Sequence, residues 1–154
     1  MCMGGRPFSE ADKADHGFSL LELLIVVTIL LIISVIAIPG LLRSRQLANE
    51  TVAVSNMRVL ATAQLTYSSS NGGIYGTIPD VIAQSLVDTR FTTGTTGYEY
   101  SVTLSPDSLS YLAEATATAP SFGRYDYYAS TDFIVRYSDD SARAPVGLAG
   151  EPVR

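Results

Sequence analysis

Residues 23–42 read LLIVVTILLIISVIAIPGLL, and this stretch decides the fold of the chain. It contains 20 residues, none of which is charged. A helix of 20 residues is about 30 Å long, which matches the hydrocarbon thickness of a bilayer. The interruptions are Thr28, Ser34 and the pair Pro39-Gly40. The run therefore predicts a membrane-spanning helix.

Outside this run the chain carries few reactive side chains. Charged residues make up 16% of the 154 residues, and the net charge is −5. Cys2, Lys13 and His16 are the only residues of their types, and all three precede residue 17. If residues 1–17 are removed, the rest of the chain has no His, Cys or Lys. The usual nucleophile–base pairs and His/Cys metal sites are then nearly excluded, so we expect neither an enzyme nor a cofactor. The acidic balance makes nucleic acid an unlikely partner, since phosphate binding needs clustered Lys and Arg.

Two ordinary kinds of segment compete to explain the apolar run. A cleaved secretory signal would end at the small-residue site Val35-Ile36-Ala37. Signal peptides, however, have a basic start and an apolar region of about 7–15 residues, whereas residues 1–17 hold two basic and three acidic residues. A plain single-pass anchor explains the length of the run. It does not explain Glu22 at the edge of the run, or the residues just before it.

The residues around the start of the run suggest a third explanation. The string Gly17-Phe18-Ser19-Leu20-Leu21-Glu22 has a Gly, an aromatic residue directly after it, and a Glu four residues later. Together with the uninterrupted apolar run, it resembles the processing site of type IV pilins and pseudopilins. The resemblance implies that residues 1–17 are a leader, cut off between Gly17 and Phe18 by a prepilin peptidase. N-methylation of Phe18 would follow. Either Met1 or Met3 could start the chain.

Glu22 has two interpretations. A carboxylate at the centre of a membrane helix costs about 2.5–3.5 kcal/mol, but at the edge it can reach the headgroups, so a tolerated boundary residue is one of them. The resemblance implies the other: Glu22 neutralises the terminal amine of a neighbouring subunit and sets the axial step of assembly. Tip-type pseudopilins tend to lack this Glu, so its presence favours a repeating or shaft subunit.

Pro39 and Gly40 are expected to break or loosen the helix. Proline removes one backbone hydrogen bond, and glycine adds flexibility. Many pilins have a proline at this place and unwind the helix nearby. An ordinary membrane-helix proline, tolerated because its neighbours satisfy the backbone, is the alternative.

The rest of the chain predicts a small α+β head. Residues 43–68 continue as an amphipathic helix, with Asn49, Asn56 and Arg58 away from its apolar stripe. The stripe is expected to be core and consists of Ala53, Val54, Met57, Leu60, Ala61 and Leu65.

Residues 69–137 are expected to form a globular head with an αβ-loop and two β-hairpins. Alternating apolar residues place the first hairpin at 98–104 and 109–117, and the second at 125–128 and 133–137. Pro79-Asp80 predicts a short helix over 81–87, and the polar residues 138–154 predict a flexible tail. With residues 18–42 as a transmembrane or fibre-core half, the resemblance implies a pilin-like fold, in which one long N-terminal helix packs against a small antiparallel sheet.

Four carboxylates of the head and tail are candidate calcium ligands, because a loop of shaft pseudopilins binds Ca²⁺ through such oxygens. They are Asp126, Asp132, Asp139 and Asp140. They lack a compact acidic spacing such as D-x-D-x-D-G. We therefore expect solvated carboxylates and no metal.

The resemblance also implies a function. The chain would be a pilin or shaft-type pseudopilin that polymerises through its N-terminal helix into a type IV pilus-like filament. Its partners would be copies of itself and related pilins, the prepilin peptidase and methyltransferase, an inner-membrane assembly platform with its ATPase motor, and membrane lipid before assembly. The head would lie outside the cytoplasm, on a single-pass protein that later joins a cell-surface or periplasmic filament. The alternative is a membrane-anchored binding or sensor domain that does not polymerise.

Overall fold

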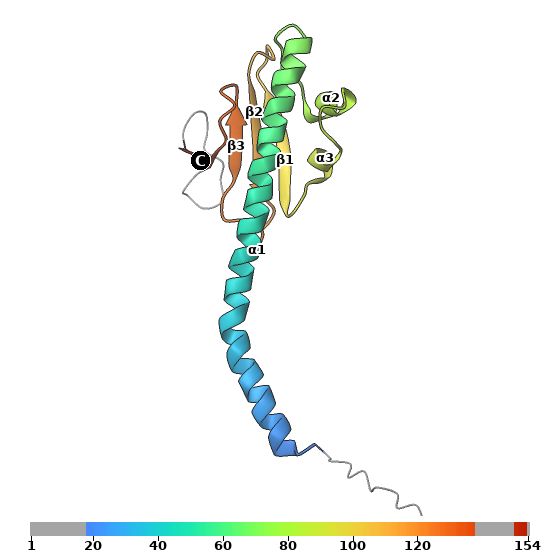
Figure 1. Ribbon diagram of the computed structural model, residues 1–154. Coiled ribbons are helices and arrows are strands. Elements are labelled where there is room, and N and C mark those ends of the chain that lie inside the picture. Colours follow the sequence, from blue (N-terminus) through green and yellow to red (C-terminus); the bar gives the residue numbers. More distant parts are fainter. Residues whose placement is uncertain (1–17, 138–149, 154) are drawn as a thin grey trace, which may run out of the picture. The chain divides into compact units, whose positions relative to one another are not determined.

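The structure is a computed structural model that describes residues 18–137 and 150–153 (Figure 1). The chain divides into two compact units, Met1–Ile38 and Pro39–Arg154, and helix α1, Leu20–Ser70, has residues in both. The predicted leader, residues 1–17, lies outside the described residues. The other elements are α2 (Ile78–Ala83), α3 (Arg90–Thr93), β1 (Tyr98–Leu104), β2 (Tyr111–Ala117), β3 (Tyr127–Ser130), β4 (Arg136–Tyr137) and β5 (Glu151–Pro152).

In the first unit, α1 is an apolar helix whose polar interruptions are satisfied internally. The Thr28 hydroxyl donates to the Leu24 carbonyl at 2.7 Å, and the Ser34 hydroxyl donates to the Leu30 carbonyl at 2.7 Å. Neither hydroxyl therefore needs water, which suits a hydrocarbon environment. Among the described residues, α1 is the one helix that is long and apolar enough to cross a membrane, judged by length and composition.

The second unit is built on an antiparallel sheet in the order β1-β2-β3-β4-β5. Strands β1 and β2 form the predicted first hairpin, in which Tyr98 pairs with Ala117 and Leu104 pairs with Tyr111. Tyr98 and Tyr100 point into the core while Glu99 and Ser101 are exposed, so the alternation in the sequence corresponds to the two faces of the sheet. Strands β3 and β4 form a second, shorter antiparallel pair.

The C-terminal part of α1 packs against this sheet, in front of β1 to β3 in Figure 1. Its buried residues recur every three or four positions, the spacing of one helix face. They are Glu50, Ala53, Asn56, Met57, Leu60, Ala61, Ala63 and Gln64. A long helix against a small five-stranded antiparallel sheet confirms the predicted α+β, pilin-like fold class.

The buried helix face differs in part from the predicted stripe. Asn56, predicted to lie elsewhere, is only 4% exposed because its side-chain amide donates to the Tyr100 hydroxyl at 2.8 Å. Leu65, predicted as core, is 52% exposed. The neighbouring Gln64 takes the core position instead and is fully buried.

Two further boundaries differ from the sequence predictions. The short helix begins earlier than predicted, at Ile78, because the Asp80 carboxylate accepts hydrogen bonds from the backbone N–H and the hydroxyl of Thr77 and so caps the helix there. At the C-terminus, residues 138–149 of the predicted tail lie outside the described residues, but Glu151–Pro152 pair with β4 as strand β5. The Val153 N–H donates to the Val135 carbonyl at 2.8 Å and holds this segment to the sheet.

Candidate functional site

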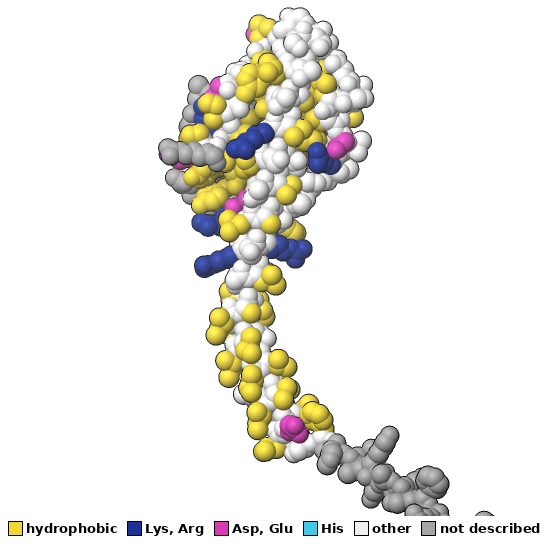
Figure 2. All heavy atoms as spheres, in the orientation of Figure 1, with side chains coloured by type: hydrophobic (Ala, Val, Ile, Leu, Met, Phe, Trp, Pro, Cys, Tyr) yellow, Lys and Arg dark blue, Asp and Glu magenta, His cyan; other side chains and the backbone are white. Residues whose placement is uncertain are grey.

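The apolar surface of α1 is the largest functional feature of the described chain. Within the first unit its apolar side chains are exposed, from Leu20 at 81% to Ile38 at 54%, and Figure 2 shows them covering the helix. Contiguous exposed apolar surface of this kind marks contact with a membrane or with other protein. The arrangement can therefore lie in lipid, and it can equally pack against other helices.

The predicted processing site lies at the start of this surface. Gly17 falls outside the described residues, and Phe18 is 76% exposed. Glu22 lies in the first turn of α1 and is exposed. A carboxylate in a first helical turn interacts favourably with the helix dipole, whatever else it does.

Sequence reasoning overlooked Ser19. The Leu23 N–H donates to the Ser19 carbonyl at 3.1 Å, which makes Ser19 the residue that precedes the first helical turn. Glu22 follows Ser19 by three positions, the S-x-x-E spacing in which Ser and Glu cap a helix start reciprocally. This spacing can be read in the sequence, and it predicts a capping role for Glu22 that is separate from any role in assembly.

Pro39 lies inside α1, and the helix continues through Gly40. A side chain at Gly40 would meet nothing within 4 Å in this chain, so the glycine is not required for packing within the chain. The two compact units divide between Ile38 and Pro39. The predicted break of the helix at this pair stays a prediction.

The four weighed calcium ligands are not brought together among the described residues. Asp126 is 3% exposed and accepts a hydrogen bond from the Ala117 N–H at 2.8 Å. Asp132 forms an ion pair with Arg136, whose hydrogen bond lowers the pKa of the Asp132 carboxyl below its ordinary value. Asp139 and Asp140 lie outside the described residues. The part of the chain that the structure describes contains no group of three or more possible metal ligands.

Side chains from one stretch of α1 form hydrogen bonds with the backbone of the loop between β2 and β3. The Gln46 side chain donates to the Pro120 carbonyl at 2.7 Å, and the Asn49 side chain donates to the Phe122 carbonyl at 3.0 Å. The buried carboxylate of Glu50 accepts from the Arg124 N–H at 2.7 Å. We call residues 46–50 and 120–124 together the loop clamp. The loop clamp could not be predicted from the sequence, because its partners are more than 70 positions apart.

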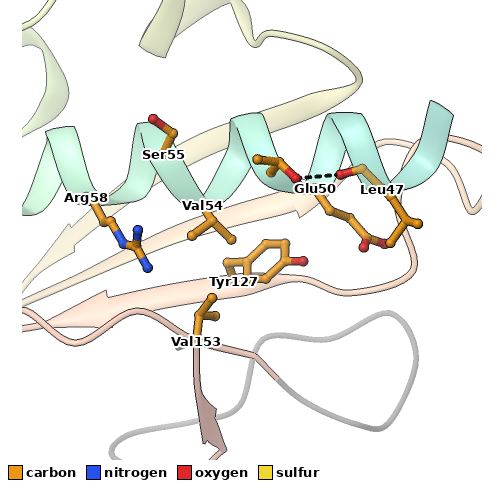
Figure 3. Close-up of a pocket in the computed structure, with 8 residues that line it drawn as sticks. Leu47, Glu50, Val54, Ser55, Arg58, Tyr127 and Val153 are labelled. Atoms are coloured by element: carbon orange, nitrogen blue, oxygen red, sulfur yellow. Dashed lines mark hydrogen bonds between the residues drawn. The ribbon is translucent and has the colours of Figure 1, made fainter. Parts of the chain in front are cut away.

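Beside the loop clamp lies an open groove of about 520 Å³, drawn in Figure 3. The Tyr127 ring lies between the helix and Val153, with Val54 on the helix side. Burial raises the pKa of the Tyr127 hydroxyl, and the nearby Glu50 carboxylate raises it further. The groove is lined by Leu47, Glu50, Thr51, Val54, Ser55, Arg58, Tyr127 and Val153, among which no nucleophile is paired with a base.

Comparisons with known proteins agree with the N-terminal features. Residues 12–38 match the family model described as the prokaryotic N-terminal methylation motif. The type IV major pilin protein PilA of Myxococcus xanthus is 36% identical over 61 residues, which are 40% of this chain. The match spans 28% of that relative's length. No solved structure matches the chain.

Proposed function

The chain is a type IV pilin-like protein, and on that premise we propose that it is a structural subunit that polymerises through its N-terminal helix into a type IV pilus-like filament. The exposed apolar surface of α1 carries the proposal, since it is far larger than a monomeric head in water would leave open. Because lipid tails are as apolar as the side chains themselves, transfer from membrane to filament yields little hydrophobic gain. Helix packing and specific polar contacts must then supply the register.

Before assembly the chain would be processed at its N-terminus. We place the cut between Gly17 and Phe18, followed by methylation of Phe18, with the prepilin peptidase as the processing partner. The family match over residues 12–38 supports this location because it includes both residues. The 17 residues removed would leave 137 in the working protein.

The mature chain would wait in the inner membrane as a single-pass protein with residues 18–42 as its membrane and fibre-core segment and its head outside the cytoplasm. Extraction would need an assembly platform and its ATPase motor. Glu22 would pair with the Phe18 amine of the next subunit, since an unpaired charge buried in a packed fibre costs several kcal/mol. This pairing favours a repeating subunit, of a pilus or of a shorter secretion pseudopilus.

Electron microscopy of sheared surface material tests the proposal. Antibodies against the head are expected to label filaments along their length, and mass spectrometry of the same material should show a chain that begins at methylated Phe18. A membrane-anchored binding domain would give labelled membrane and no labelled filament. A chain beginning at Ile38 would support a cleaved signal peptide and contradict the pilin-like processing.

A further inference from the structure

The head unit has a basic pocket whose two arginines form no ion pair within the described residues. Its volume is about 350 Å³, within the range of small-ligand pockets, and it is lined by Arg43, Gln46, Leu47 and Arg124. Figure 2 shows Lys and Arg side chains gathered near this end of the head. Among residues 18–137 and 150–153, ion pairs engage Arg90 and Arg136, and none engages Arg43 or Arg124.

The loop clamp builds this pocket from two distant parts of the chain. Arg43 comes from α1, whereas Arg124 comes from the loop between β2 and β3. The buried Glu50 carboxylate holds the Arg124 N–H at 2.7 Å and so fixes the backbone at this residue. The Arg124 guanidinium donates to the Tyr125 hydroxyl at 3.1 Å and lies 5.1 Å from the centroid of that ring.

Two guanidinium groups around one pocket repel each other unless an anion lies between them. The Tyr125 contact uses one of the Arg124 nitrogens, which leaves other N–H donors for a ligand. A guanidinium presents a rigid fork of donors that matches the oxygens of a phosphate group. The nearby Glu50 carboxylate accepts from the Arg124 backbone N–H and is not among the residues that line this pocket. The pocket therefore has two positively charged side chains with N–H donors that a phosphate could use.

Its place in the sequence indicates where such a phosphate would come from. Arg43 directly follows Leu42, the last residue of the uncharged run. In a helix that crosses a bilayer, the first polar residue after the apolar run lies at headgroup depth. The 20-residue run thus brings one wall of the pocket to the level of the lipid phosphates.

We propose that Arg43 and Arg124 bind a phosphate group, which the anchored subunit takes from an anionic phospholipid headgroup. The choice of a lipid source rests on the membrane-anchored stage of the proposed function. The bound headgroup holds the head against the membrane surface until assembly. Extraction of the subunit then requires release of this phosphate as well as release of the apolar helix from lipid.

The test is native mass spectrometry of the full chain in detergent, with phosphatidylglycerol or phosphatidylcholine added. We expect the wild-type chain to retain phosphatidylglycerol in preference to phosphatidylcholine. Arg43→Gln and Arg124→Gln should each lower its retention about fivefold, the effect of one basic group near an anionic surface. Arg43→Lys should retain part of the binding. Arg58→Gln is the matched control, because Arg58 also has no ion-pair partner among the described residues but lies outside this pocket.

A titration with inorganic phosphate distinguishes the source of the ligand. Phosphate binding that Arg43→Gln abolishes, without a preference for phosphatidylglycerol, would support the phosphate site and assign it a soluble anion. Equal retention of both lipids with no phosphate binding would overturn the proposal, as would an Arg58→Gln variant that loses as much as the pocket variants. The assay uses unassembled protein, so a chain that forms no filament can still pass it, and a chain that assembles normally can still fail it.

Discussion

At the scale of single residues, Glu22 has two proposed roles, and a substitution by alanine would remove both. It has the spacing from Ser19 of a helix cap, and it is proposed to pair with the amine that cleavage would create on Phe18 of a neighbouring subunit. A cap needs a hydrogen-bond acceptor, which glutamine also provides. A partner for an amine in a packed fibre needs negative charge. The two roles therefore predict different filament yields for Glu22→Gln, which keeps the acceptor and removes the charge.

We predict that Glu22→Ala and Glu22→Val insert into the membrane normally and give few filaments, measured as sheared surface material. Glu22→Gln should be as defective as Glu22→Ala, because it keeps the acceptor and loses the charge. Ser19→Ala is the control for the cap and should assemble. A Glu22→Gln variant with normal filament yield would show that the charge is not needed, and would sink the pairing with the Phe18 amine.

Gln64 is the second residue whose role can be isolated. It is fully buried, its amide donates to the Gly76 carbonyl at 2.6 Å, and it accepts from the Gly76 N–H at 3.1 Å. Gly76 has no room for a side chain, since a Cβ there would lie 2.8 Å from the Tyr67 ring. The pair therefore fastens the segment after α1 back onto the helix.

Gln64→Ala should reduce the free energy of unfolding of the head by about 3 kcal/mol, because two buried backbone groups lose their partners. Urea unfolding of the full chain in mild detergent, followed by tyrosine fluorescence, measures the change. Gln84→Ala removes an exposed amide whose hydrogen bond to Asn71 is long, at 3.4 Å, and should change the stability by less than about 0.5 kcal/mol. Equal effects of the two substitutions would contradict the role given to Gln64.

At the scale of elements, the turn between β3 and β4 contains an ion pair between Asp132 and Arg136. The Asp132 carboxylate forms this ion pair across the turn with the Arg136 guanidinium. The same carboxylate accepts a hydrogen bond from the Ile134 N–H at 3.2 Å. The hydrogen bond from Arg136 is the main cause that lowers the pKa of Asp132 below 3.8. The folded head therefore favours the charged form of this carboxyl, more than the unfolded chain does.

A lowered pKa fixes the sign of the pH dependence. The stabilisation is present above the unfolded pKa, near 3.8, and is lost as the pH falls through the lower folded value. Asp132→Asn should thus lower stability at neutral pH and flatten the part of the acid unfolding curve below about pH 4. Asp88→Asn is the control, since its pair with Arg90 is exposed. If Asp132→Asn leaves the acid unfolding curve below about pH 4 unchanged, the ion pair does not stabilise the head in this pH range.

The elements that the sequence predicted well are those whose pattern is local. The hairpin of β1 and β2 shows in the alternation from Tyr98 onward, and α1 shows in its apolar run. The polar residues that hold the head together were missed because their partners are backbone atoms of distant segments, as Glu50 and Arg124 illustrate. Strand β5 was missed because two residues, one of them Pro152, carry no strand pattern; proline is tolerated there because β5 is an edge strand.

At the scale of the whole molecule, the part of α1 in the first unit is the proposed membrane segment. Leu31 is 63% exposed in the apolar run, and Leu65 is 52% exposed on the head portion of the same helix. The two residues thus have the same type, lie on the same helix and have similar exposure. They differ in whether lipid or water is expected around them.

We predict that Leu31→Arg strongly reduces the fraction of chain that stays in the membrane after alkaline carbonate extraction. A charge at the centre of a spanning helix costs about 2.5–3.5 kcal/mol. Leu65→Arg should leave this fraction unchanged, because its side chain would remain in water. The same result for both substitutions would mean that residues 23–42 do not span the bilayer.

The loop clamp has a consequence for how the surface of this protein can change over time. Gln46, Asn49 and Glu50 bind the Pro120 carbonyl, the Phe122 carbonyl and the Arg124 N–H, all of which are backbone groups. The exposed Ser121 between them contributes no side chain to these contacts, whereas Gly123 packs against Tyr98 and has no room to change. An exposed loop that is fastened by its backbone can accept new side chains without loss of the fold. Ser121 can therefore change while the helix beneath the loop stays the same, whereas Gly123 and the proposed phosphate ligand Arg124 cannot.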